Sequence, residues 1–142
     1  MALPKKPDRS LRILLVDDDP DTRLLCRRLL ERLGHQVTVA EEGLEAMGLL
    51  RDHEWDIVLT DQNMPGACGV DVLERAFKLQ PGALRLLMSS ILDPRMKEEA
   101  QARGHVQAFI EKPLDRGAFE DAGRAVFAGR GPAHVKLHPP EG

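Results

Sequence analysis

Short apolar runs alternate along this chain with longer segments whose apolar residues recur at helical spacing. We expect strands at residues 11–16, 36–40, 57–60, 84–88 and 108–110, each followed by a helix. Such strict alternation requires right-handed crossover connections, which make the strands parallel and cover both faces of the sheet with helices. The sequence therefore predicts an α/β fold, a doubly wound domain built on a five-stranded parallel sheet.

Composition excludes several other classes of protein. The 142 residues suit one hydrophobic core, and 42% apolar with 30% charged residues is typical of a folded globular domain. No apolar run approaches the ~20 residues of a membrane helix, and the first ten residues lack the apolar stretch of a secretory signal, so we expect a cytoplasmic protein. The net charge of −3 argues against direct nucleic acid binding.

Composition also divides the chain. We expect an N-terminal extension at residues 1–10, one domain at residues 11–128, and a Gly- and Pro-rich linker or tail at residues 129–142. No second domain follows in this sequence, so the chain is either a stand-alone protein or the front part of a longer one. We favour the second interpretation.

Polar residues gather where the predicted strands end. They are Asp17, Asp18 and Asp19 after the first strand, Asp61 and Asn63 after the third, Ser89 and Ser90 after the fourth, and Lys112 with Pro113 after the fifth. In open parallel sheets the functional crevice lies beyond the carboxyl ends of the strands. We therefore expect these residues to form one site.

The residue types in this predicted crevice indicate a particular chemistry. Clustered carboxylates repel one another, and a divalent cation with a preference for oxygen ligands, such as Mg²⁺, offsets that repulsion. A carboxylate neutralised in this way can attack a phosphoryl group, whose oxygens would accept hydrogen bonds from Lys112 and Ser89. Ser90 is small enough to let a phosphoryl donor approach. The acids alone support only a metal pocket.

Four sequence motifs carry a resemblance to a known family. ILLVDDDP, DIVLTDQNMPG, LLMSS and FIEKP, in this order, resemble the receiver domains of response regulators across roughly residues 11 to 128. The resemblance implies a flavodoxin-like fold with strand order 2-1-3-4-5 and a role in two-component signalling. It implies a sensor histidine kinase or phosphotransfer protein as the partner, and a signalling module instead of a turnover enzyme. A homodimer that forms on phosphorylation is a further option.

The resemblance also implies a role for each matching residue. Asp61 would be the phosphoacceptor and a metal ligand, Asp18 a direct Mg²⁺ ligand, Asp17 a ligand through water, and Asn63 a ligand through its backbone carbonyl. Ser89 would be the hydroxyl switch residue, Phe109 the aromatic that turns inward on activation, and Lys112 the phosphate partner before a cis peptide at Pro113. Asn63 and Ile91 would tune the lifetime of the phosphoryl group.

Three positions depart from the pattern of the family. Phe109 replaces the more usual tyrosine, Ser89 replaces the commoner threonine, and Gly104 stands one residue away from the usual glycine before Lys112. The hydroxyl chemistry survives these changes, but a phenylalanine has no phenol hydroxyl with which to bind a partner. We therefore expect the phosphoacceptor chemistry to be retained and the output geometry to differ.

Other interpretations remain open at this point. The two overlapping D-x-D patterns in DDDPDT would suit a Mg²⁺ phosphohydrolase of the haloacid dehalogenase type, with Asp17 or Asp19 as nucleophile. A degenerate receiver would act as a binding module without phosphorylation. Phe109 could be an ordinary core aromatic, and the cysteines Cys26 and Cys68 receive no role. The arginines of the first helix indicate a solvated face, with a kinase-docking surface as the alternative: Arg23, Arg27, Arg28 and Arg32.

Overall fold

The structure is a computed structural model that describes residues 10–127 and 133–135 of the chain. Strands and helices alternate throughout this part of the chain, as the hydrophobic pattern predicts. They are β1 (Arg12–Val16), α1 (Pro20–Arg32), β2 (Gln36–Ala40), α2 (Gly43–Asp52), β3 (Ile57–Asp61), α3 (Gly69–Leu79), β4 (Leu84–Ser89), α4 (Pro94–Gly104), β5 (Ala108–Glu111), α5 (Arg116–Phe127) and β6 (Ala133–Val135).

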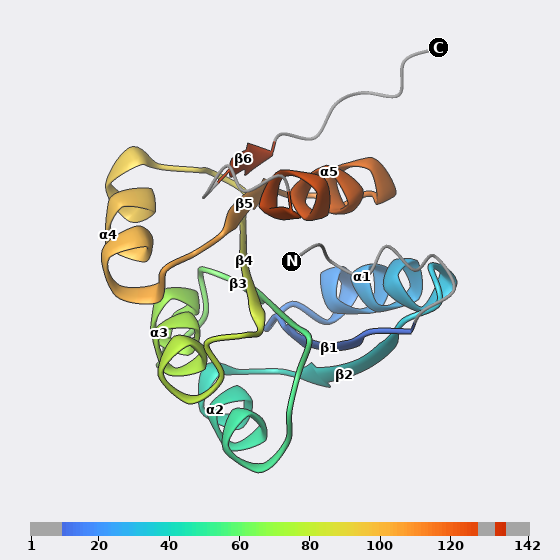
Figure 1. Ribbon diagram of the computed structural model, residues 1–142, viewed down its shortest axis with the longest axis horizontal. Coiled ribbons are helices and arrows are strands. Elements are labelled where there is room, and N and C mark those ends of the chain that lie inside the picture. Colours follow the sequence, from blue (N-terminus) through green and yellow to red (C-terminus); the bar gives the residue numbers. More distant parts are fainter. Residues whose placement is uncertain (1–9, 128–132, 136–142) are drawn as a thin grey trace.

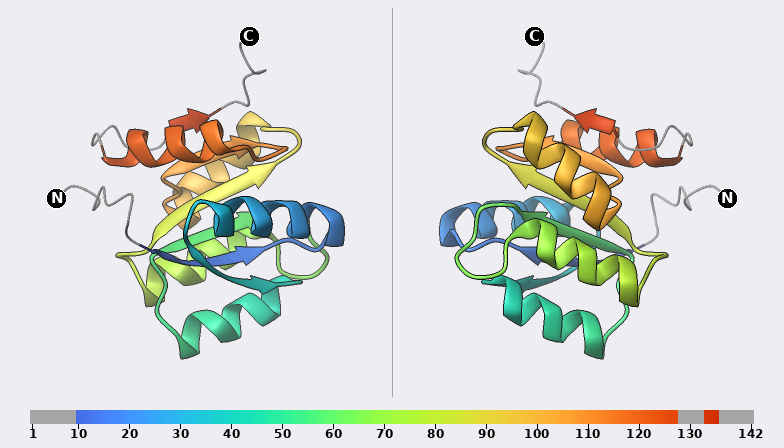
Figure 2. Two further views of the ribbon diagram at one scale, coloured as in Figure 1. Left: turned by 90° about the vertical axis from the view of Figure 1, so that its right-hand side faces the viewer. Right: turned by 90° about the vertical axis from the view of Figure 1, so that its left-hand side faces the viewer.

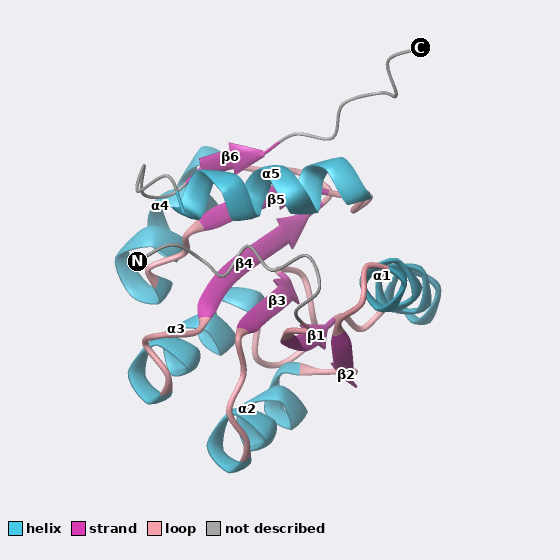
Figure 3. Cartoon of the chain, turned by 45° about the vertical axis from the view of Figure 1, so that its right-hand side comes forward, coloured by secondary structure: helices cyan, strands magenta, loops and turns pink. Residues whose placement is uncertain are grey.

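All strands of the sheet are parallel, and they lie in the order β2-β1-β3-β4-β5-β6. Figure 3 shows them side by side with the twist of an open sheet. The predicted flavodoxin-like order 2-1-3-4-5 is therefore confirmed for the first five strands. The order in which strands are added to the sheet reverses at β1, which has β2 on one side and β3 on the other.

Helices cover both faces of the sheet. Figure 1 and the two views in Figure 2 show α1 and α5 on one face, and α2, α3 and α4 on the other. Alternate residues of β1 point to opposite cores, so that Ile13 and Leu15 pack toward α1 and α5 while Leu14 and Val16 pack toward α2 and α3. No helix among the described residues is long and apolar enough to cross a membrane.

The sixth strand lies inside the segment predicted as linker or tail. β6 pairs in parallel with β5, with Phe109 opposite His134, and also contacts α5. A strand of three residues in a Gly- and Pro-rich segment gives no periodicity that a sequence could reveal. β6 covers the edge of β5, which would otherwise present unpaired backbone groups.

Truncation after Phe127 should therefore expose the edge of β5. We expect faster hydrogen exchange at the β5 backbone amides that face β6, because they would lose their pairing partners. The β1 amides, which lie between β2 and β3, should exchange as before and serve as the internal control. Unchanged exchange throughout β5 would contradict the pairing seen here.

Candidate functional site

The register of the sheet brings the predicted site residues together. Val16 pairs with Thr60, Asp61 with Met88, and Ser89 with Glu111, so β1, β3, β4 and β5 end side by side. The residues that follow these partners are Asp17 and Lys112. One edge of the sheet thus carries the carboxylates, the hydroxyl and the ammonium group.

Three carboxylates form the centre of the site. Asp17, Asp18 and Asp61 each offer an oxygen, and these oxygens lie within 4.8 Å of one another. Asp17 is fully buried and Asp61 is 5% exposed, whereas Asp18 faces solvent. Buried carboxylates at this spacing require positive charge between or beside them.

Lys112 provides part of that charge. Its Nζ lies 3.0 Å from Oδ2 of Asp17 and 3.2 Å from Oδ1 of Asp61, with only 14% of the side chain exposed. Burial by itself would lower the pKa of Lys112, but the negative charges of Asp17 and Asp61 outweigh burial and raise that pKa. The lysine therefore remains an ammonium group that can bind a phosphoryl oxygen.

The local environment disfavours the charged form of Asp61. Burial raises the pKa of this carboxyl, Lys112 opposes the shift, and the negative charges of Asp17 and Asp18 add to it. One lysine does not offset all of the negative charge in the pocket. A divalent cation would favour the ionised, nucleophilic form of Asp61.

Asp17 has an oxygen available to such a cation. Its Oδ1 accepts a hydrogen bond from the backbone N–H of Asp19 at 2.9 Å. Its Oδ2 is buried and, although close to Lys112, accepts no well-directed hydrogen bond. Buried polar atoms left without a hydrogen bond are uncommon and call for a partner. Three oxygen donors with one such atom fit Mg²⁺, which takes oxygen ligands and keeps several waters.

The loop after β3 is shaped by a close backbone approach. A Cβ atom on Gly69 would lie 2.5 Å from the carbonyl oxygen of Asp61, so only glycine lets α3 begin so near the end of β3. Gln62 holds this loop, because its side chain accepts from the N–H of Val70 at 2.9 Å. Asn63 lies in the same loop, exposed to solvent, two residues beyond Asp61.

The hydroxyl of Ser89 faces the loop between β4 and α4. It donates to the carbonyl oxygen of Ile91 at 2.8 Å, and Oγ of Ser89 accepts from the backbone N–H of Ile91 at 3.3 Å. Ser89 is buried, whereas Ser90 is exposed and Ile91 has 76% of its surface exposed. The hydroxyl thus belongs to the loop in this state of the molecule.

Phe109 lies inside the protein. The ring is 2% exposed, packs in the core beneath α2, α3 and α4, and has Nζ of Lys97 5.6 Å from its centroid. The peptide bond between Lys112 and Pro113 is cis. An inward aromatic and an ammonium group therefore stand at opposite ends of the short segment 109–112.

Asp19 has a structural task at the start of α1. Its carboxylate accepts from the backbone N–H of Thr22 at 2.9 Å and from the hydroxyl of the same residue at 2.5 Å. These bonds lower the pKa of Asp19, and they make it the N-cap of the helix. Asp19 is the one acid of the triplet that does not join the carboxylate cluster.

Sequence reasoning missed the part played by Arg23. The arginines of α1 were expected on a solvated face, yet Arg23 donates from Nη1 to the backbone carbonyl of Asp17 at 2.8 Å, and its side chain is only 16% exposed. The sequence did hold one indication of this role, because Arg23 stands near the start of a helix that begins directly after the acidic residues. Arg27 does lie at the surface, where it pairs with Glu31.

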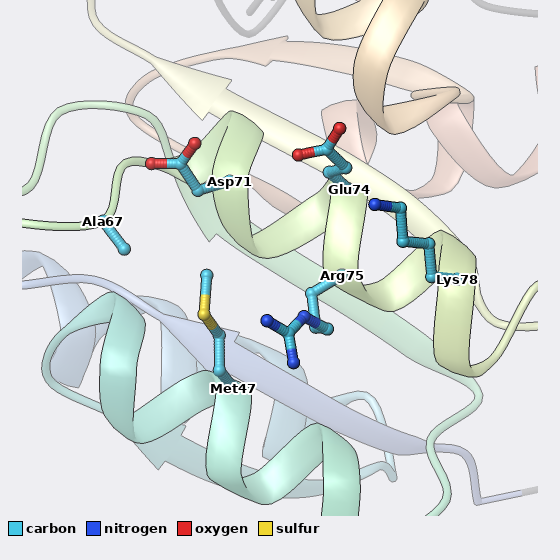
Figure 4. Close-up of a pocket in the computed structure, with 6 residues that line it drawn as sticks. All are labelled: Met47, Ala67, Asp71, Glu74, Arg75 and Lys78. Carbon is cyan, nitrogen blue, oxygen red and sulfur yellow. The ribbon is translucent and has the colours of Figure 1, made fainter.

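A hollow lies between α2 and α3. Figure 4 shows its lining side chains, which come from Met47, Ala67, Asp71, Glu74, Arg75 and Lys78. The carboxylates of Asp71 and Glu74 are engaged by Arg103 of α4, at 2.6 and 2.9 Å. This hollow contains none of the residues predicted for the site.

Comparison with known proteins agrees with this geometry. The family model described as "Response regulator receiver domain" matches residues 13–123. Protein PilH of Pseudomonas aeruginosa is 31% identical over 119 residues, which are 83% of this chain and 98% of PilH. Virulence sensor protein BvgS of Bordetella pertussis is 38% identical over 104 residues, which are 70% of this chain but only 8% of that much longer protein.

A solved structure shows the same fold. The receiver domain of a sensor histidine kinase from Pseudomonas aeruginosa, crystallised with a magnesium ion in its active-site cleft, has a TM-score of 0.73 and 21% identity. The match covers 83% of this chain and 98% of that one. The fold, the match across residues 13–123 and the similarity to PilH lead to one conclusion: the chain belongs to the response regulator receiver domain family.

Proposed function

We propose that Asp61 is the residue at which this receiver domain accepts its phosphoryl group, in a reaction that depends on Mg²⁺ held by Asp17, Asp18 and Asp61. The backbone carbonyl of Asn63 completes the proposed set of ligands. The observation that carries the proposal is the position of Lys112, whose ammonium group lies 3.2 Å from Asp61 inside a cluster of acids.

The proposed donor is a phosphorylated histidine of a sensor histidine kinase or phosphotransfer protein. An oxygen of the Asp61 carboxylate forms a new O–P bond as the N–P bond to the histidine breaks, and the electron pair remains on the imidazole nitrogen. Lys112 and the hydroxyl of Ser89 then bind oxygens of the phosphoryl group. Bound Mg²⁺ would neutralise charge on the carboxylates and on the phosphoryl oxygens.

The position of Asp19 supports Asp61 as the nucleophile and argues against the alternative hypothesis of a phosphohydrolase. A hydrolase built on the D-x-D patterns would use Asp17 or Asp19. Asp19 is committed to capping α1, and Asp17 is buried against Lys112 with one oxygen bound by a backbone N–H. A degenerate receiver is disfavoured because the acid, hydroxyl and lysine groups are all present in one site.

The signal would leave the site through Ser89 and Phe109. Phosphorylation would draw the Ser89 hydroxyl away from the carbonyl of Ile91 and so release the loop between β4 and α4. The ring of Phe109, which already lies inward in this structure, would have more space there once the loop moves. We also propose that the module acts in the cytoplasm. A further proposal is that phosphorylation causes homodimer formation, which would appear as earlier elution in size-exclusion chromatography with beryllofluoride.

Intact mass after incubation with acetyl phosphate and Mg²⁺ tests the proposed chemistry. We expect one added phosphoryl group per chain with Mg²⁺ and none when EDTA removes the metal. Equal labelling with and without EDTA would contradict the metal requirement. Absence of labelling under both conditions, from acetyl phosphate and from a cognate kinase, would contradict the proposed function.

Substitution Ser89→Ala separates the chemistry from the switch. We expect the variant to accept a phosphoryl group, several-fold more slowly, because Lys112 and the metal remain. The backbone NMR shifts of α4 should change much less on addition of beryllofluoride than they do in the original protein. Ser90→Ala, which alters an exposed neighbour, is the matched control and should respond fully. A full α4 response in Ser89→Ala would exclude this serine as the switch.

A further inference from the structure

Arg23 connects the ends of two neighbouring strands. From the second turn of α1 its Nη1 donates to the carbonyl oxygen of Asp17, directly after β1, at 2.8 Å. Its Nη2 lies 3.9 Å from the carboxylate of Glu41, directly after β2. The carboxylate of Glu41 is 72% exposed, so that contact is weak, and the bond to the carbonyl is the main anchor.

The backbone of Asp17 is held on both sides. Its N–H donates to the carbonyl of Ala40 at 3.1 Å, and its C=O accepts from Arg23. Its side chain is fixed by the N–H of Asp19. Only Asp17, Asp18 and Asp19 separate β1 from α1, so the orientation of both metal-ligand candidates depends on these few backbone bonds.

The forces at this position oppose one another. Three carboxylates with oxygens within 4.8 Å repel, and a loop free to move would separate them. The guanidinium group is always charged, so it holds the carbonyl at every working pH. Supporting hydrogen bonds of this kind orient metal ligands, and their loss typically costs about 10- to 100-fold in metal affinity.

We propose that Arg23 is a positioning residue that sets the Mg²⁺ affinity of the site by fixing the backbone of Asp17 between β1 and β2. The proposal rests on the Mg²⁺ pocket of the proposed function. It assigns Arg23 no contact with the metal or the phosphoryl group.

The direction of the change in Mg²⁺ affinity provides a sharp test. If Arg23 acted only through its charge, Arg23→Ala would bind Mg²⁺ more tightly, because a nearby positive charge would be gone. If it positions Asp17, the variant should bind about 10-fold more weakly. Arg27→Ala removes the same charge from the exposed side of the same helix and should leave the affinity nearly unchanged.

Two measurements on unphosphorylated protein test whether Arg23 positions Asp17. Calorimetric titration gives the Mg²⁺ affinity of each variant, and hydrogen exchange of the metal-free protein reports on the backbone N–H groups of residues 17–19. We expect faster exchange there in Arg23→Ala and not in Arg27→Ala, with β4 amides unchanged in both. Arg23→Lys, which keeps a charged donor, should recover part of the affinity, and Glu41→Gln should lose at most about two-fold.

Equal or tighter Mg²⁺ binding by Arg23→Ala would overturn the proposal. If Arg23→Ala does not fold, Arg23→Lys and Arg23→Gln carry the test, and affinities equal to that of Arg27→Ala would overturn it. None of these readouts depends on phosphorylation. Failure of Asp61 labelling in a protein that binds Mg²⁺ would therefore count against the proposed function and leave the assignment of Arg23 in place.

Discussion

Asp61→Asn will accept no phosphoryl group from acetyl phosphate or from a histidine kinase. The amide has no anionic oxygen to attack phosphorus, and Asp17 is buried beside Lys112 with one oxygen bound by the N–H of Asp19. Intact mass spectrometry gives the result directly. Asp21→Asn removes an exposed acid from the first turn of α1 and should be labelled like the original protein.

In the absence of metal, Asp61→Asn should be more stable against unfolding than the original protein. Burial raises the pKa of Asp61, so at neutral pH the folded state holds a carboxylate in an unfavourable environment. A raised folded-state pKa means that stability is lost as the pH rises through the carboxyl range, and asparagine removes this loss. We expect a gain of roughly 0.5–2 kcal/mol by urea unfolding at pH 7, which shrinks toward low pH.

Two results would contradict this account of Asp61. Labelling of Asp61→Asn at the original rate would place the nucleophile elsewhere. A variant that is less stable at neutral pH, yet loses no labelling, would show a structural carboxylate. Mg²⁺ provides the internal control, because it should stabilise the original protein more than it stabilises the variant.

Lys112→Met should show the second large effect. Removing one preorganised donor from a transition state of this kind costs about 10²–10³ in rate, and we expect phosphorylation to slow by that order. Without the ammonium group the buried carboxylates of Asp17 and Asp61 lose their compensating charge. The metal-free variant should therefore be destabilised by about 1–3 kcal/mol.

Added Mg²⁺ should recover most of the stability of Lys112→Met and little of its rate. We expect this difference because the metal can compensate the charge of the carboxylates but has no N–H groups to donate to the phosphoryl oxygens, as Lys112 would. Lys78→Met, on the exposed face of α3, is the matched control for both measurements. Wild-type phosphorylation rates in Lys112→Met would remove the lysine from the mechanism.

Much of the fold could be predicted because its signals are local. The apolar runs that became β1, β3 and β4 are nearly fully buried, as strands covered on both faces must be. Asp17, Asp61 and Lys112 could be grouped into one site from the sequence alone, because parallel strands bring their carboxyl ends to one edge of the sheet. Residue type and position in the sequence were sufficient to predict this grouping.

Other features depend on neighbours that the sequence does not reveal. Arg23 resembled its surface neighbours, and only the fold shows that it reaches the carbonyl of Asp17. The displaced glycine has a physical counterpart: α4 ends at Gly104, and His105 takes the left-handed conformation with φ 47, where glycine would be unstrained. Stacking of His105 on Phe77, with centroids 3.9 Å apart, contributes to holding it there.

Chemical trapping of the phosphorylated residue tests the central claim most directly. Borohydride reduces an aspartyl phosphate to homoserine, and peptide mass spectrometry then locates the converted residue. We predict conversion at position 61 alone, dependent on both acetyl phosphate and Mg²⁺. Homoserine at position 17, 18 or 19 would contradict the account and would revive the phosphohydrolase interpretation.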